Sequence, residues 1–187
     1  HSPPGRRIVR NYLTVLDAQA KDREIDEVLH RHAALLADDE EAKRVRAMSL
    51  LRRNRLSEAR RALLAISGEL SREGTFLVTL GTVEARLGHL REARIRFEAA
   101  SRTTPGYSPA WRQLGICLND LGDYAGAQGA LETAVRLAPE DRSAWQALSF
   151  AAWKRSDWPL ARRALQKLAA LDPANPEPRQ LLAQLPG

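Results

Sequence analysis

Apolar residues recur three or four positions apart in two short segments of residues 108–141, on either side of a break at Gly122-Asp123. This spacing puts the apolar side chains on one face of each segment, which predicts two amphipathic α-helices. The chain has no stretch in which Val, Ile and Thr alternate with polar residues between turns, the pattern typical of strands. We therefore expect an all-α fold built from helix pairs.

The same pattern returns after a shift of 34 residues in either direction. Downstream, the residues Trp111, Leu114, Ala127, Leu137 and Pro139 correspond to Trp145, Leu148, Ala161, Leu171 and Pro173. Upstream, the residues Leu114, Gly115, Gly122, Ala127, Ala134 and Pro139 correspond to Leu80, Gly81, Gly88, Ala93, Ala100 and Pro105. A fixed period of this length indicates a repeat architecture in which each helix pair stacks on the next.

This register divides the chain into helix pairs of one length. Four clear pairs are expected at residues 40–73, 74–107, 108–141 and 142–175, after a degenerate pair at 6–39. Residues 1–5 should form a disordered linker or tag remnant. Residues 176–187 should form a helix that covers the last pair, because the exposed apolar end of a stack needs a cap. The pair at 40–73 lacks the closing Pro, so residues 67–73 should form an irregular loop.

Particular residue types predict where helices begin, end and approach each other. The residues expected to cap helix starts are Ser57, Ser108 and Asp157, whose side-chain oxygens can accept hydrogen bonds from free amides. Gly88 suits a helix end in the left-handed conformation, which only Gly adopts cheaply. Gly126 and Gly129 fall inside a helix, and we expect them to permit close helix approach.

The spacing of Trp111, Leu114-Gly115, Ala127, Ala134 and Pro139 resembles the tetratricopeptide repeat, a helix–turn–helix unit of the same period. The resemblance extends over residues 40–175 and fades in 6–39. It implies a right-handed superhelical solenoid of antiparallel helix pairs. It also implies a scaffold for protein–protein interaction, a role that this repeat fills in many pathways.

In proteins of this family, the first helix of each pair lines a concave groove that receives an extended peptide or a partner helix. The groove residues that the resemblance implies are Arg44, Met48, Arg52, Val78, Thr82, Arg86, Arg112, Ile116, Asn119, Gln146, Phe150 and Trp153. Arginine beside apolar and aromatic side chains is favoured at protein interfaces, and the arginine stripe favours a partly acidic partner. An alternative for Phe150 and Trp153 is that they pack against the C-terminal helix.

The family's groove can also clamp a C-terminal carboxylate with Lys, Asn and Arg side chains. The corresponding positions here hold Arg44, Met48, Thr79, Pro109 and Gln113, of which only Arg44 could serve. We therefore expect no such clamp.

The chain carries 29 Lys and Arg against 23 Asp and Glu, a net charge of +6. This excess admits binding to nucleic acid as a less favoured function. Arginines are spread along every repeat and interleaved with acidic residues, and no run of five like charges occurs. The charge pattern is therefore typical of solvated helix faces.

Candidate catalytic or metal-binding groups are not arranged for chemistry. His30 and His32 are two residues apart and point away from each other on a helix, and the single Cys117 lies among apolar residues. We expect no enzyme activity, cofactor, metal site or small-molecule substrate, and no apolar run is long enough to cross a membrane.

The interpretation favoured by these patterns is a scaffold that binds a protein or peptide in its groove, with homo-oligomerisation left open. An alternative is the recognition arm of a larger enzyme, such as a sulfotransferase or glycosyltransferase. That alternative arises because the chain begins at His1 without a Met, so we expect it to be a fragment.

Overall fold

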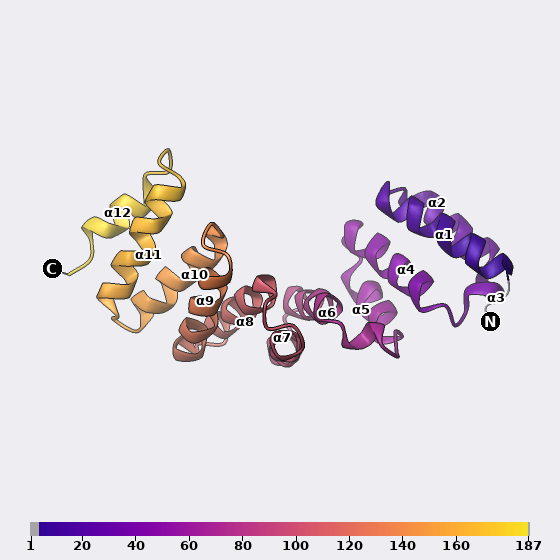
Figure 1. The fold of residues 1–187 in the computed structure, drawn as a ribbon, viewed down its shortest axis with the longest axis horizontal. Helices are drawn as coiled ribbons and strands as arrows, with labels where there is room; N and C mark the ends of the chain where they lie inside the picture. The colour runs from indigo at the N-terminus through magenta and orange to yellow at the C-terminus, as the bar shows by residue number, and fades with distance from the viewer. Residues whose placement is uncertain (1–3, 187) are drawn as a thin grey trace. The chain divides into compact units, whose positions relative to one another are not determined.

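The computed structural model describes residues 4–186, and in these residues it contains helices and no strand (Figure 1). The α-helices are α1 (Pro4–Ala18), α2 (Asp22–Arg31), α3 (Ala33–Leu36), α4 (Glu40–Arg52), α5 (Leu56–Leu64), α6 (Gly74–Arg86), α7 (Leu90–Thr103), α8 (Ser108–Asp120), α9 (Tyr124–Leu137), α10 (Arg142–Lys154), α11 (Trp158–Leu171) and α12 (Glu177–Ala183). The predicted all-α class is confirmed. The chain divides into two compact units, His1–Arg72 and Glu73–Gly187.

The first unit contains α1 to α5. The inner face of α1 packs on α2 and α4 through a core that includes Leu13, Leu16, Ile25, Val28 and Val45. These residues lie three or four apart within each helix, so each helix turns one apolar face inward. Helix α4 then pairs with α5.

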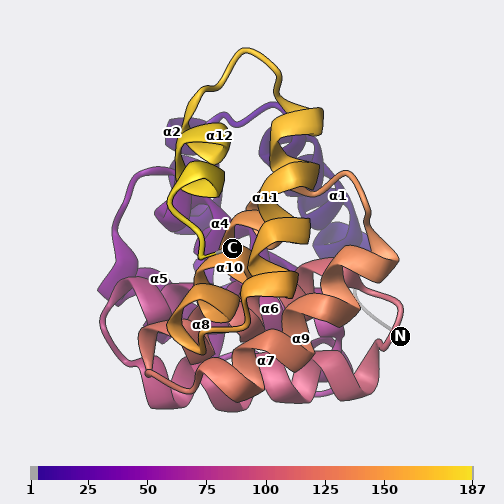
Figure 2. The ribbon, with the colours of Figure 1, turned by 90° about the vertical axis from the view of Figure 1, so that its left-hand side faces the viewer.

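The second unit contains three antiparallel helix pairs, α6–α7, α8–α9 and α10–α11, followed by α12. Each pair stacks on the next through one continuous core, in which Phe97, Leu114, Leu131, Leu148 and Leu165 are buried. Helix α12 lies alongside α11, and Leu182 and Leu185 pack against the same core (Figure 2).

The tight turn inside each helix pair uses a left-handed residue. These residues are Ala20, Asn54, Gly88, Gly122 and Ser156, with φ between 53° and 83°. They are spaced 34 residues apart from one end of the chain to the other, including the N-terminal pair that lacks most of the motif. This spacing supports the proposed division into 34-residue pairs.

A second repeated feature links Trp and Pro of consecutive pairs. The indole Nε1 of Trp111 donates a hydrogen bond to the carbonyl of Pro105 at 2.8 Å, and Trp145 makes the same bond to Pro139. The Pro residue ends one pair and the Trp lies on the first helix of the following pair. Each bond therefore holds two successive pairs in a fixed orientation, which gives these motif residues a structural role.

Several helix boundaries differ from the sequence prediction. Residues 1–3 lie outside the described part of the chain, and Pro4 and Gly5, expected in a linker, form the first turn of α1. The loop at 67–73 contains the short 3-10 turn Leu70–Arg72. The second helix of the N-terminal pair ends at Arg31, and the short helix α3 follows it, because the chain changes direction at His32.

The expected serine caps are wrong, whereas an aspartate cap is confirmed. Helix α5 begins at Leu56 after Arg55, whose side chain makes no capping hydrogen bond, and Ser57 lies inside the helix. Ser108 is the first residue of α8, and its hydroxyl donates to the Ala134 carbonyl of α9 at 3.2 Å. The carboxylate of Asp157 does cap α11, since it accepts from the Leu160 amide.

The glycines that permit close helix approach are not the predicted ones. A Cβ at Gly115 would lie 2.3 Å from Cγ of Leu131, and one at Gly81 would lie 2.6 Å from Cε1 of Phe97. A Cβ at Gly129 would meet nothing within 4 Å, and at Gly126 it would meet the capping carboxylate of Asp123. The prediction for Gly126 and Gly129 is therefore wrong, because their α-carbons do not face another helix.

Candidate functional site

The predicted groove residues of the first unit lie on α4, where their charges are compensated within the chain. The Arg52 guanidinium pairs with Asp17 at 2.7 Å and with Asp22 at 2.6 Å. Burial acts to raise the pKa of the Asp22 carboxyl, but the Arg52 hydrogen bonds bring it below its usual value. Arg44 pairs with Glu41 within α4 at 2.6 Å and with Asp17 of α1 at 3.6 Å. Both arginines therefore join α4 to the neighbouring helices of the first unit. Met48, which lies between Arg44 and Arg52 in the sequence, is half-buried.

The predicted groove residues of the second unit lie on the first helices of its three pairs. The members are Val78, Thr82 and Arg86 on α6, Arg112, Ile116 and Asn119 on α8, and Gln146, Phe150 and Trp153 on α10. Val78, Thr82, Ile116 and Trp153 are half-buried, whereas Arg86 and Gln146 are exposed.

Two of these residues bond to neighbouring segments of the chain. The Arg112 guanidinium pairs with the Asp141 carboxylate at 2.6 Å. Asn119 is buried, and its amide nitrogen donates to the Ala147 carbonyl of α10 at 3.0 Å. Both side chains therefore connect α8 to the segment that follows α9, although the buried Oδ1 atom of Asn119 accepts no hydrogen bond.

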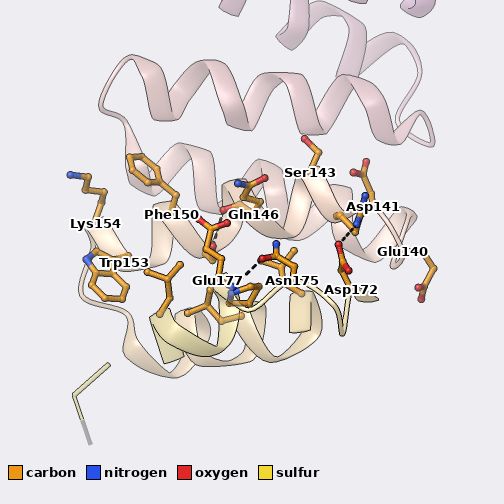
Figure 3. Close-up of a pocket in the computed structure, with 16 residues that line it drawn as sticks. Glu140, Asp141, Ser143, Gln146, Phe150, Trp153, Lys154, Asp172, Asn175 and Glu177 are labelled. Atoms are coloured by element: carbon orange, nitrogen blue, oxygen red, sulfur yellow. Dashed lines mark hydrogen bonds and ion pairs between the residues drawn. The ribbon is translucent and has the colours of Figure 1, made fainter. Parts of the chain in front are cut away.

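Gln146, Phe150 and Trp153 line a hollow of about 960 Å³, which we name the α10–α12 hollow. Its walls are α10, the end of α11, and the segment that leads into α12 (Figure 3). Apolar side chains that contribute to the lining are Leu165, Leu168, Pro178 and Leu181. A volume of this size fits a drug-sized ligand or a short stretch of peptide.

The two ends of the α10–α12 hollow differ in chemistry. Phe150, Trp153 and Lys154 lie at one end, and the acidic residues Asp141 and Asp172 lie at the other (Figure 3). Asp141 pairs with Arg112, and Asp172 pairs with Arg142 at 2.6 Å. The acidic end is therefore already neutralised, whereas the aromatic end presents apolar surface to solvent.

The side chain of Phe150 is 46% exposed, although it belongs to a large apolar residue. Its ring meets the edge of Tyr124 at a centroid distance of 6.0 Å, and the Lys154 ammonium lies 5.4 Å from the ring centroid. Trp153 meets Trp158 at 5.7 Å. Both aromatics thus have neighbours on α9 or α11, and Phe150 keeps nearly half of its surface exposed at the edge of the hollow.

Sequence reasoning did not include the residues of the opposite wall. Asn175 and Glu177 lie in the middle of the hollow, where the Asn175 side-chain oxygen accepts from the Glu177 amide at 3.0 Å (Figure 3). They lie about 25 residues after Phe150 in the sequence, Asn175 at the end of the predicted pair 142–175 and Glu177 in the segment 176–187 that was expected to cap the stack. The sequence signal that could have indicated these two residues was their polarity near the start of the predicted cap helix.

The single cysteine of the chain, Cys117, is buried. Burial raises the pKa of the Cys117 thiol to about 11, so this thiol is protonated at neutral pH, and it donates to the Leu90 carbonyl at 3.3 Å. Between residues 4 and 186, no cluster of three or more His, Cys, Asp or Glu could hold a metal ion. The helices of this part of the chain also include none that is both long and apolar enough to span a membrane.

Comparison with known proteins finds one family model and several solved structures that resemble parts of this chain. The sequence model of the tetratricopeptide repeat matches residues 85–149. No curated protein matches the chain in sequence. Among solved structures, MamA (residues 41 to the end) from Desulfovibrio magneticus RS-1 is 26% identical, with a TM-score of 0.73 over 79% of this chain and 84% of that one.

Two further structures resemble the chain in fold. YrrB, a tetratricopeptide repeat protein with an unusual peptide-binding site, is 17% identical, with a TM-score of 0.78 over 92% of this chain and 89% of that one. The first repeat domain of Spaghetti (RPAP3), bound to the HSP90 peptide SRMEEVD, is 18% identical, with a TM-score of 0.57 over 62% of this chain and 91% of that one. Proteins of this repeat family are typically non-catalytic scaffolds for protein–protein interaction. The chain carries the tetratricopeptide repeat at residues 85–149 and has the all-α fold of tetratricopeptide repeat proteins.

Proposed function

We propose that this protein is an interaction scaffold that binds a peptide or helical segment of a partner protein in the α10–α12 hollow. The observation that carries the proposal is the exposure of Phe150, which lines the hollow together with Trp153. Aromatic side chains in a recess dominate binding energy at many protein interfaces, because they bury a large area at a small cost in conformational entropy.

The chemistry of the hollow defines the kind of segment that fits. An apolar side chain of the partner packs on Phe150 and Trp153, while Gln146 and Asn175 offer amide groups to the backbone of a bound segment. Since Arg112 and Arg142 are paired with carboxylates, the hollow selects its partner mainly by apolar surface and hydrogen bonding. Peptides bound by YrrB and by the Spaghetti domain give this mode of binding a precedent in the same fold.

A peptide-display selection on the immobilised full chain tests the proposal. Selected peptides should lose affinity by about 2 kcal/mol or more when Phe150 is changed to Ala, as truncation of an aromatic anchor does. Gln146→Ala should weaken binding less, by about 0.5–1.5 kcal/mol, since it removes one hydrogen bond. Isothermal calorimetry measures both values.

Ile95→Ala is the matched control, because Ile95 is 60% exposed on α7 and does not line the hollow. Its affinity for the selected peptides should equal that of the unchanged protein. Peptides that bind Phe150→Ala as tightly as the unchanged protein would place the binding surface elsewhere.

A further inference from the structure

The outward face of α1 presents three large apolar side chains to solvent. Ile8 is 69% exposed, Tyr12 is 50% exposed and Val15 is 51% exposed. They are four and three residues apart, so they form one stripe along the helix, which we name the α1 stripe. The opposite face of α1 is anchored, since Leu13 and Leu16 are buried in the core of the first unit.

The equivalent positions in the second unit are covered by another helix. In the 34-residue register, the α1 stripe corresponds to Ala110, Leu114 and Cys117 on α8 and to Ala144, Leu148 and Ala151 on α10. All six residues are buried, with at most 7% of the side chain exposed. Helix α7 packs against α8, and helix α9 packs against α10. The α1 stripe therefore occupies positions that, on α8 and α10, are covered by the preceding helix.

The contacts between α7 and α8 indicate the orientation of a helix that packs on the α1 stripe. Ala110, near the start of α8, packs with Ala100, near the end of α7. Cys117, near the end of α8, donates to the Leu90 carbonyl at the start of α7. A helix that covers α1 in this way runs antiparallel to it, with its last turns over Ile8 and its first turns over Val15.

The size and charge of the surface restrict the occupant further. Ile8, Tyr12 and Val15 are larger than most of their counterparts on α8 and α10, so the incoming helix must offer small side chains. Arg7 and Asn11 are both exposed and border the stripe, with Arg7 in the first turn of α1 and Asn11 at its middle. Residues 1–72 contain 15 Lys and Arg against 11 Asp and Glu, which disfavours a second copy of this chain and favours an acidic helix.

We propose that the α1 stripe docks an amphipathic helix of another protein, with small side chains along one face and acidic side chains beside Arg7. The helix lies antiparallel to α1 and takes the place that α7 takes on α8. This surface belongs to the first unit and is independent of the α10–α12 hollow, so either proposal can fail without the other.

Two designed helical peptides of about twenty residues test the docking, the length that spans α1 with one turn to spare. Both carry Ala along the face that meets the stripe and Leu beside it. One has Glu at its remaining positions, and the other has Lys. Fluorescence anisotropy of each labelled peptide against the full chain at low ionic strength measures binding. The Glu peptide should bind at least about tenfold more tightly than the Lys peptide, because it complements Arg7.

Ile8→Asp and Tyr12→Asp should each lower the affinity for the Glu peptide by about tenfold or more, since each removes an apolar contact that is buried in the complex. Arg7→Glu should reverse the preference between the two peptides. Ile95→Asp, a change at a similarly exposed isoleucine on α7, should leave binding unchanged. Circular dichroism of every variant verifies that the helices remain folded.

Three results would overturn the proposal. One is equal affinity for the Glu and Lys peptides, or a loss of affinity with Ile95→Asp equal to that with Ile8→Asp. Another is a dimer of the unchanged protein, in sedimentation velocity, that Ile8→Asp dissociates, which assigns the stripe to a second copy. The third is binding to phosphatidylglycerol vesicles that Tyr12→Asp abolishes while the Glu peptide fails to bind, which assigns it to a lipid surface.

Discussion

Single residues decide how closely the two helices of a pair approach. Gly115 faces Leu131 so closely that no side chain fits between them, whereas Gly129 faces open space on the same helix pair. The two glycines lie in similar helical surroundings, yet they differ in what their α-carbons meet. Gly115 is required by packing, and Gly129 only lowers the helical propensity of α9.

Alanine substitutions should separate these two roles. Gly115→Ala should lower the free energy of unfolding by about 1–3 kcal/mol, because the added methyl group overpacks the contact with Leu131. Gly129→Ala should raise it by up to about 1 kcal/mol, because Ala is the better helix former. Urea denaturation followed by circular dichroism measures both. A loss of stability in Gly129→Ala equal to that in Gly115→Ala would refute this account of the packing.

At the scale of elements, each helix pair depends on one left-handed residue in its turn. Gly88 and Gly122 adopt this conformation without a Cβ, whereas Ala20, Asn54 and Ser156 carry one. A non-glycine residue in this region is strained by about 1–2 kcal/mol relative to its preferred conformations. Three of the five turns thus carry backbone strain that a glycine would relieve.

Ser156→Gly should therefore raise the free energy of unfolding by up to about 1 kcal/mol, the strain relieved less the greater flexibility of Gly in the unfolded chain. Gly122→Ala, the reciprocal change, should lower it by about 1 kcal/mol. Thermal unfolding of both variants gives the comparison. A lower melting temperature for Ser156→Gly would show that the hydroxyl of Ser156 contributes more than the backbone strain costs.

At the scale of the whole molecule, the chain forms two compact units, and the boundary at Arg72 and Glu73 falls at the end of the segment 67–73. This segment has a left-handed Gly68, a short 3-10 turn and several exposed residues. Such a segment opens locally at a lower free energy than a packed helix does. We therefore expect this segment to be cleaved by proteases more readily than the packed helices.

Limited trypsin digestion should first cut after Arg72, which is exposed at the end of the 3-10 turn. The arginines within α6 to α11 should be protected, because cleavage there requires a packed helix to unfold. Mass spectrometry should detect fragments 1–72 and 73–187 before any others. A first cut inside one of those helices would show that the second unit opens more readily than the segment between the units.

Much of the fold was predictable from the sequence because the signals are local. The spacing of apolar residues sets the helices, and Gly88 and Gly122 mark turns that only a left-handed residue can make. The recurrence of Trp111 and Trp145 at a fixed interval predicted the stacked pairs, and the bonds to Pro105 and Pro139 explain why these residues occur together.

The site was less predictable, because exposure depends on what packs on a residue from far along the chain. Arg112 and Asn119 lie at predicted groove positions, yet Arg112 pairs with Asp141 and the Asn119 amide nitrogen donates to the Ala147 carbonyl. The Phe150 side chain stays exposed, because the ring that contacts it is Tyr124 and because α12 packs alongside α11.

The sequence by itself determined the helical class and the 34-residue repeat, since both follow from side-chain periodicity along the backbone. Only the tertiary structure decided which of the repeated positions remain available to a partner. Equivalent positions are buried on α8 and open on α1 because a helix packs on the first and none of the described helices covers the second. The availability of a repeated position is a property of its neighbours in space, which its own residue type does not encode.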